Sequence, residues 1–133
     1  MLFSAGRAFV LIFFILEAQE PQVAGPATLH PAVIQSFQTG NVTALLPLFH
    51  TQVEIHLPEQ EGIYHRSQAV MILQNFLRIH NVKSFSVLHQ GRDEEGAAYF
   101  IGLCQGDAPY RVYIFQKQTP EGPVIQEIRI DPQ

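Results

Sequence analysis

The chain has 133 residues, of which 47% are hydrophobic, and its net charge is -4. This length suits one domain with a core of its own, and the composition excludes a disordered chain. Twelve acidic residues stand against eight Lys and Arg residues, so a basic nucleic-acid surface is not expected. The single cysteine, Cys104, cannot form an internal disulfide. We expect it to be a small buried strand residue, with a bridge between two subunits as the alternative.

The first residues have the order of a secretory signal. One positive charge, Arg7, precedes the apolar run Ala8–Leu16, which polar residues follow. A nine-residue helix is only about 13 Å long, too short for a hydrocarbon core of roughly 30 Å. We therefore predict a signal peptide over residues 1–18, a flexible leader over 19–28 and no membrane span after cleavage. The protein is expected to be periplasmic or extracellular; the alternative is an apolar helix packed on the domain.

The remaining residues, 29–133, predict one α+β domain. Apolar spacing predicts a helix over His30–Thr39, a short one over Asn41–Phe49 and a long one over Ser67–His80. Alternating or continuous apolar segments between turn signals predict the strands. These are Val53–Leu57, Ile63–Tyr64, Ser84–Gly91, Ala97–Gln105, Tyr110–Gln118 and Val124–Asp131. The expected fold is two or three N-terminal helices packed on a curved antiparallel sheet.

Strand parity predicts which side chains face the helices. A two-residue turn at Gly106-Asp107 would pair the strands so that the apolar residues share one face. The predicted inner face comprises Phe85, Val87, His89, Tyr99, Ile101, Leu103, Val112, Ile114, Ile128 and Ile130, with Gln116 and Gln126 at one end. The outer face would carry Cys104 and a patch that we predict to be a homodimer interface: Phe100, Arg111, Tyr113, Phe115 and Arg129. The alternative is a solvated outer face.

Short motifs in a fixed order suggest a family. They are Gly40-Asn41, Glu61-Gly62-Ile63-Tyr64, Gln68-Ala69, Ile72-Leu73-Gln74-Asn75-Phe76, His89-Gln90-Gly91, Tyr110-Arg111-Val112-Tyr113 and Ile128-Arg129-Ile130. With them the chain resembles, over roughly residues 30 to 131, an uncharacterised family of exported Bacteroidetes proteins with the nuclear transport factor 2-like cone fold. The resemblance implies fold and export but no activity. Family members carry a small hydroxyl residue where this chain has His65, so Ser67 is expected to cap the long helix.

No catalytic motif stands out. The six histidines form no pair with metal-ligand spacing, so neither a metal nor another cofactor is expected. The first hypothesis is an exported binding or interaction module, its cone either filled or holding a small apolar ligand. His89, Tyr99, Gln116 and Gln126 would supply the polar contacts to that ligand. The alternative is a small-molecule lyase or isomerase that uses His89 and Tyr99, which requires an open cavity of about 300 Å³ or more.

Overall fold

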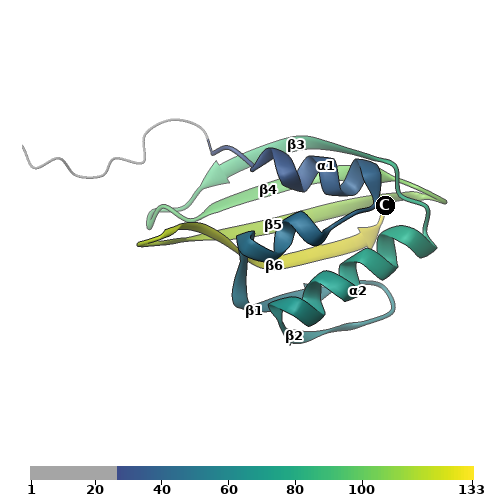
Figure 1. Cartoon of the computed structure of the whole chain (residues 1–133). Helices are drawn as coiled ribbons and strands as arrows, with labels where there is room; N and C mark the ends of the chain where they lie inside the picture. Colours follow the sequence, from purple (N-terminus) through teal and green to yellow (C-terminus); the bar gives the residue numbers. More distant parts are fainter. Residues whose placement is uncertain (1–26) are drawn as a thin grey trace, which may run out of the picture.

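The computed structural model describes residues 27–133, so the predicted signal peptide and most of the leader lie outside the described residues. Three helical segments and six strands follow one another (Figure 1). In order they are α1 (Pro31–Thr39), the 3₁₀ helix η1 (Thr43–Leu48), β1 (Phe49–His56), β2 (Glu61–His65), α2 (Arg66–Ile79), β3 (Ser84–Arg92), β4 (Ala98–Gln105), β5 (Pro109–Thr119) and β6 (Gly122–Pro132).

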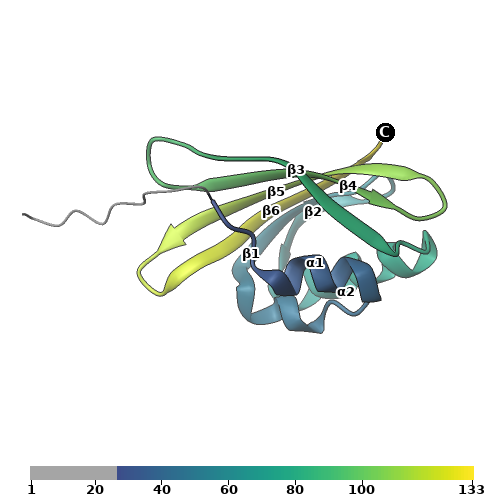
Figure 2. The same cartoon turned by 90° about the horizontal axis from the view of Figure 1, so that it is seen from above.

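The strands form one curved six-stranded sheet in the order β2-β1-β6-β5-β4-β3. All neighbours are antiparallel except β1 and β6, which are parallel. The expected fully antiparallel sheet is therefore wrong, because the last strand inserts between β1 and β5 and runs in the direction of β1. The helices lie on one side of the sheet, and its other side carries no described helix (Figure 2). Within residues 27–133, no helix has the length and apolar character needed to cross a membrane.

Histidine side chains begin both α-helices. The ring Nδ1 of His30 accepts a hydrogen bond from the N–H of Ala32, and the ring Nδ1 of His65 accepts one from the N–H of Ser67. A ring nitrogen thus takes the place of the side-chain oxygen that usually satisfies a free N–H at a helix start. The sequence suggested Ser67 as the cap of α2, but the cap is His65. The second predicted helix is the short 3₁₀ helix η1, which contains Pro47.

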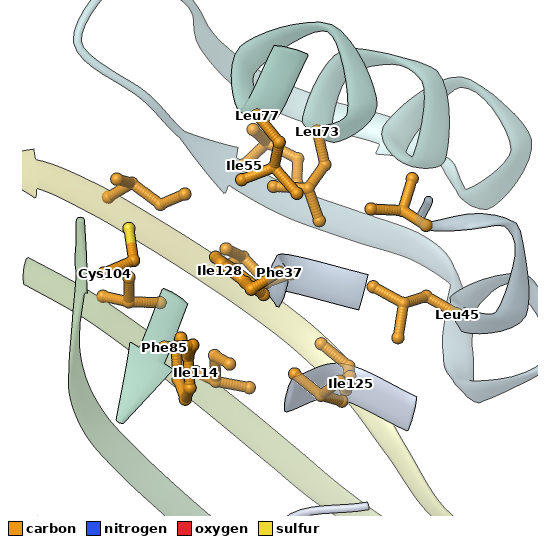
Figure 3. Close-up of a cluster of buried hydrophobic side chains, with 14 of the residues drawn as sticks. Phe37, Leu45, Ile55, Leu73, Leu77, Phe85, Cys104, Ile114, Ile125 and Ile128 are labelled. Carbon is orange, nitrogen blue, oxygen red and sulfur yellow. The ribbon is translucent and has the colours of Figure 1, made fainter. Parts of the chain in front are cut away.

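The core fills the space between the helices and the concave face of the sheet. Phe37 of α1 packs on Phe85 of β3 with ring centroids 4.7 Å apart, and Phe100 is fully buried. Figure 3 shows the rings of Phe37 and Phe85 in one buried cluster with aliphatic side chains from α2, β1, β5 and β6. Those it labels, all at most 1% exposed, include Ile55, Leu73, Leu77, Ile114, Ile125 and Ile128.

The β4–β5 hairpin determines which side of β4 faces the helices. Gln105 is opposite Pro109, so the loop has three residues, Gly106–Ala108, and not the two expected from the sequence. The N–H of Asp107 donates to the carbonyl of His80, directly after α2, at 2.7 Å. This contact holds the longer loop against the end of the helix. The register of β4 is shifted by one residue as a result, which moves each of its side chains to the opposite face.

The predicted faces of β4 are consequently reversed. Phe100 and Cys104, expected on the outer face, are fully buried on the helix side. Tyr99, Ile101 and Leu103, expected inside, lie on the outer face with only partial cover. Cys104 as a bridge between two subunits does not fit this structure, because the side chain is fully buried and cannot reach a second chain. The same burial raises the pKa of its thiol to about 12.

Two bulges complete the difference from the predicted register. Val87 pairs with Gly102 but His89 pairs with Ile101, so Leu88 is an extra residue and His89 is on the outer face. In β6 the partners of Phe115 and Gln116 are Glu127 and Ile125, which leaves Gln126 as the extra residue. The predicted pairs His89 with Tyr99 and Gln116 with Gln126 are therefore wrong.

Candidate functional site

The four residues predicted to contact a ligand do not line a common cavity. His89 and Tyr99 lie on the outer face of the sheet, and the Tyr99 side chain is 36% exposed. Gln116 is buried on the helix side, and Gln126 occupies the β6 bulge. The prediction of a polar pocket inside the cone fails because the shifted register of β4 turns Tyr99 away from the helices and the bulge at Leu88 does the same to His89.

The outer face does bring together four of the five residues predicted there. In β5 and β6, Arg111 opposes Asp131, Tyr113 opposes Arg129 and Phe115 opposes Glu127, as expected. Beside them, β4 contributes Tyr99 opposite Phe115, Ile101 opposite Tyr113 and Leu103 opposite Arg111. We call these nine residues the outer patch. An apolar band of Tyr99, Ile101, Leu103, Tyr113 and Phe115 thus borders a charged band of Arg111, Glu127, Arg129 and Asp131.

A hollow marks the boundary between the two bands. It measures about 390 Å³ and is lined by Ile101, Arg111, Tyr113, Glu127, Arg129 and Asp131. Its cations and carboxylates alternate, with Arg129 Nη2 donating to Glu127 Oε2 at 2.9 Å. The surface is therefore apolar on one side and nearly charge-balanced on the other, which suits a protein partner better than a small apolar molecule.

A second group of polar residues lies next to the outer patch, where β1 joins β6. His56 Nε2 is 2.7 Å from Glu54 Oε2 and 3.8 Å from Glu127 Oε2. Its other ring nitrogen, Nδ1, is 2.9 Å from Glu61 Oε1. Hydrogen bonds to Glu54 and Glu61 raise the pKa of His56 above 6.5. This group could not be predicted in full from the sequence, because Glu127 joins it only through the parallel β1–β6 pairing. Glu54 and His56 are two residues apart on one strand, so the sequence does place them on one face.

A third group joins α2 to the β4–β5 hairpin. His80 Nδ1 contacts Asp107 Oδ2 at 2.9 Å, and His80 Nε2 contacts Glu59 Oε2 at 3.1 Å. The hydroxyl of Tyr110 donates to Asp107 Oδ1 at 2.9 Å. Phe76 packs on the His80 ring with centroids 4.4 Å apart. These contacts hold the β4–β5 loop, which sets the register of β4, against the end of α2. The group therefore stabilises the fold.

The His80 group makes the stability of the protein depend on pH. Burial lowers the pKa of His80, but the hydrogen bonds and charges of Asp107 and Glu59 outweigh it and raise the pKa above 6.5. The pKa of Asp107 is lowered from 3.8, first by its hydrogen bond to His80. The His80 contribution is therefore complete below pH 6.5 and is lost as the pH rises through the raised pKa. The Asp107 contribution is present above pH 3.8 and is lost as the pH falls.

Replacing His80 with glutamine tests this dependence. As the pH rises from about 5.5 to about 8.5, the free energy of unfolding of the wild type should fall relative to that of His80→Gln. Urea denaturation at a series of pH values measures the difference. His50→Gln serves as the control, since the ring of His50 contacts the carbonyl of Gln52 and not a carboxylate. Parallel curves for wild type and His80→Gln would show that the ion pair does not form.

Two structures with low sequence identity support the cone architecture. One, named Rd1NTF2_04 with long sheet, is 13% identical, with a TM-score of 0.62 over 75% of this chain and 94% of that chain. The other, from Nostoc punctiforme, is a domain of unknown function with a cystatin-like fold. It is 11% identical, with a TM-score of 0.64 over 78% of this chain and 72% of that chain. At these identities the likeness concerns the fold alone. It confirms the predicted nuclear transport factor 2-like and cystatin-like architecture.

A more similar structure and a family model point to one family. The crystal structure of a DUF4783 family protein from Bacteroides ovatus is 25% identical, with a TM-score of 0.72 over 79% of this chain and 96% of that chain. A search of the curated proteins gives no match. The family model described as Domain of unknown function (DUF4783) matches residues 30–131. The chain therefore belongs to the DUF4783 family.

Proposed function

We propose that this protein is an exported interaction module that binds a second copy of itself through the outer patch. The observation that carries the proposal is the uncovered apolar band on β4 and β5. Tyr99, Ile101, Leu103, Tyr113 and Phe115 lie on the face that carries no described helix, and none of them is fully buried. A contiguous apolar surface with a charged border is the usual anatomy of a protein interface.

The charges of the outer patch favour a second copy as the partner. Arg111 and Arg129 alternate with Glu127 and Asp131 around the hollow. A two-fold interface presents the same patch from both sides, so each residue type must find its complement within the patch itself. Rows that contain both signs of charge can meet this condition, whereas a patch of one sign would repel its copy. Aromatic and Arg side chains, both present here, are also enriched in interfaces.

The core packing argues against the alternatives held open by the sequence. Phe37, Phe85 and Phe100 occupy the concave side where an apolar ligand was expected. A lyase or isomerase using His89 and Tyr99 would need both side chains in a shielded cavity, so that a pKa can be tuned. His89 is exposed and Tyr99 covers Gly91 on the outer face, with its hydroxyl 2.6 Å from where a Gly91 Cβ would lie. Their position favours a contact role.

Sedimentation velocity on the mature protein tests the dimer. The wild type should sediment as a dimer at concentrations on the order of 10 µM, and Tyr113→Asp should weaken the dimer by at least about 30-fold, because it buries a charge at the centre of the interface. Met71→Asp is the matched control. Met71 is a 70% exposed apolar residue of α2, on the helix side of the sheet, so this variant should remain dimeric.

Two results would contradict the proposal. A wild type that is monomeric across the concentration range would exclude a dimer of useful affinity. Dissociation of Met71→Asp together with an intact Tyr113→Asp dimer would place the interface on the helices instead.

A further inference from the structure

We propose that Glu54, His56 and Glu127 form a binding site for one divalent transition-metal ion, represented by Zn²⁺. The three side chains come from the adjacent strands β1 and β6, and Glu54 is directly opposite Glu127 in the parallel pair. One donor atom from each residue lies within 4.8 Å of the other two. The set combines one imidazole nitrogen with two carboxylate oxygens, which is a ligand type that Zn²⁺ accepts.

The separations of the donor atoms fit a single ion. Zn²⁺ bonds to nitrogen and oxygen are about 2.0–2.2 Å long, so two ligands of a tetrahedral site are about 3.4 Å apart. His56 Nε2 is 2.7 Å from Glu54 Oε2 and 3.8 Å from Glu127 Oε2. These two distances lie on either side of the required value. The shorter contact is a hydrogen bond between His56 and Glu54, so the ion would take the place of its proton and the two glutamate side chains would rotate toward the ion.

The next layer of contacts has the arrangement found around metal ligands. Glu61 Oε1 lies 2.9 Å from His56 Nδ1, so it can hold the Nδ1 proton and aim Nε2 at the two carboxylates. Arg129 Nη2 donates to Glu127 Oε2 at 2.9 Å and orients that carboxylate. Around zinc ions, the histidine nitrogen that does not bind the metal commonly donates to a carboxylate, and a carboxylate ligand commonly accepts a hydrogen bond of its own.

Charge and accessibility also favour a cation at this position. Glu54, Glu61 and Glu127 bring three negative charges around His56, and Arg129 offsets one of them. The side chains of His56 and Glu127 are 21% and 18% exposed, and that of Glu54 is 44% exposed. The site is thus partly enclosed yet reachable from solvent, as a site with three protein ligands and one open position must be.

All three ligands belong to one chain, so the metal site does not depend on the proposed dimer. The sequence showed no metal-ligand spacing because Glu127 reaches the other two ligands only through the β1–β6 pairing. The site adjoins the outer patch through Glu127, and a bound ion could therefore be examined in the monomeric Tyr113→Asp variant as well. Failure of either proposal leaves the other intact.

Isothermal titration of untagged, EDTA-treated protein with Zn²⁺ tests the site. We expect binding of one equivalent, retained in Tyr113→Asp. His56→Ala should weaken the affinity at least about 100-fold, and Glu61→Gln should weaken it about 10- to 100-fold through the outer nitrogen of His56. Mg²⁺ should bind far more weakly, because it prefers oxygen ligands and retains its water.

His50→Ala is the matched control, since His50 lies on the same strand outside the cluster; it should bind Zn²⁺ like the wild type. Thermal denaturation without metal checks that each variant folds. If His56→Ala does not fold, Glu61→Gln still tests the site, because the Glu61 side chain is 68% exposed and its replacement should leave the fold intact. The proposal is overturned if wild type shows no stoichiometric binding. It is equally overturned if His56→Ala and Glu61→Gln both bind Zn²⁺ like wild type.

Discussion

Replacing Phe100 with alanine is expected to lower the free energy of unfolding by about 3–5 kcal/mol, the usual cost of removing a buried phenylalanine ring. Phe100 is fully buried in the core and lies opposite Ile114 of β5. The alanine leaves a cavity between the helices and the sheet that the rigid strands cannot close. Urea denaturation measures the change, and the dependence on urea should keep its slope if the fold is unchanged.

Tyr99→Ala is the matched control for Phe100→Ala, because the two residues are neighbours on opposite faces of β4. Removing the Tyr99 ring from the outer face should cost at most about 1 kcal/mol, the scale of a cross-strand pair. Both substitutions are best made in the Tyr113→Asp background, so that dimerisation does not contribute to the measured stability. If Tyr99→Ala costs more than Phe100→Ala, the register of β4 described above is wrong.

The second large effect is expected at Gly106, in the loop that sets this register. A Cβ at this position would lie 2.2 Å from the carbonyl oxygen of His80 and 3.0 Å from the backbone nitrogen of Val82. Both neighbours are backbone atoms, so the loop itself must move, and the bond from the Asp107 N–H to His80 would be lost. Gly106→Ala should therefore cost about 2–4 kcal/mol, from overpacking of about 1–3 and one hydrogen bond of about 0.5–1.5.

Gly62→Ala provides the comparison for Gly106→Ala under the same urea denaturation. Its Cβ would meet the hydroxyl end of Tyr64 at 3.0 Å, and a side chain can move aside where a backbone cannot. We expect a change below about 1 kcal/mol. Equal and small effects of the two substitutions would mean that the hairpin loop does not press against the end of α2.

Helix and strand positions could be predicted because they depend on local patterns. The long helix was expected over Ser67–His80 and is found over Arg66–Ile79, since its wide apolar face repeats with the helical period. The pairing of β5 with β6 was also predicted correctly as far as Phe115 opposite Glu127, because both strands alternate regularly there. In that part of the β5–β6 pair, a register shifted by one residue would have placed Ile114 or Ile128 in solvent.

The face of β4 could not be predicted, because both of its faces are apolar. Phe100 and Cys104 on one side compete with Tyr99, Ile101 and Leu103 on the other, so hydrophobicity does not choose between them. The choice is made by the three-residue loop and its contact with His80, which is distant in the sequence. Errors at His89 and Gln126 have a similar origin, because a bulge inserts one residue without a signal in the apolar pattern.

The proposed dimer can be examined through the chemistry of a single thiol. Cys104 is buried and its pKa is raised to about 12. The native chain should therefore react slowly with a maleimide and contribute little to the labelling signal. The cysteine added in Ile101→Cys lies at the centre of the outer patch. The cysteine added in Met71→Cys lies at an exposed position of α2. The labelling rate of Ile101→Cys should fall as protein concentration rises, and that of Met71→Cys should not change. A rate at position 101 that is independent of concentration would contradict pairing through the sheet.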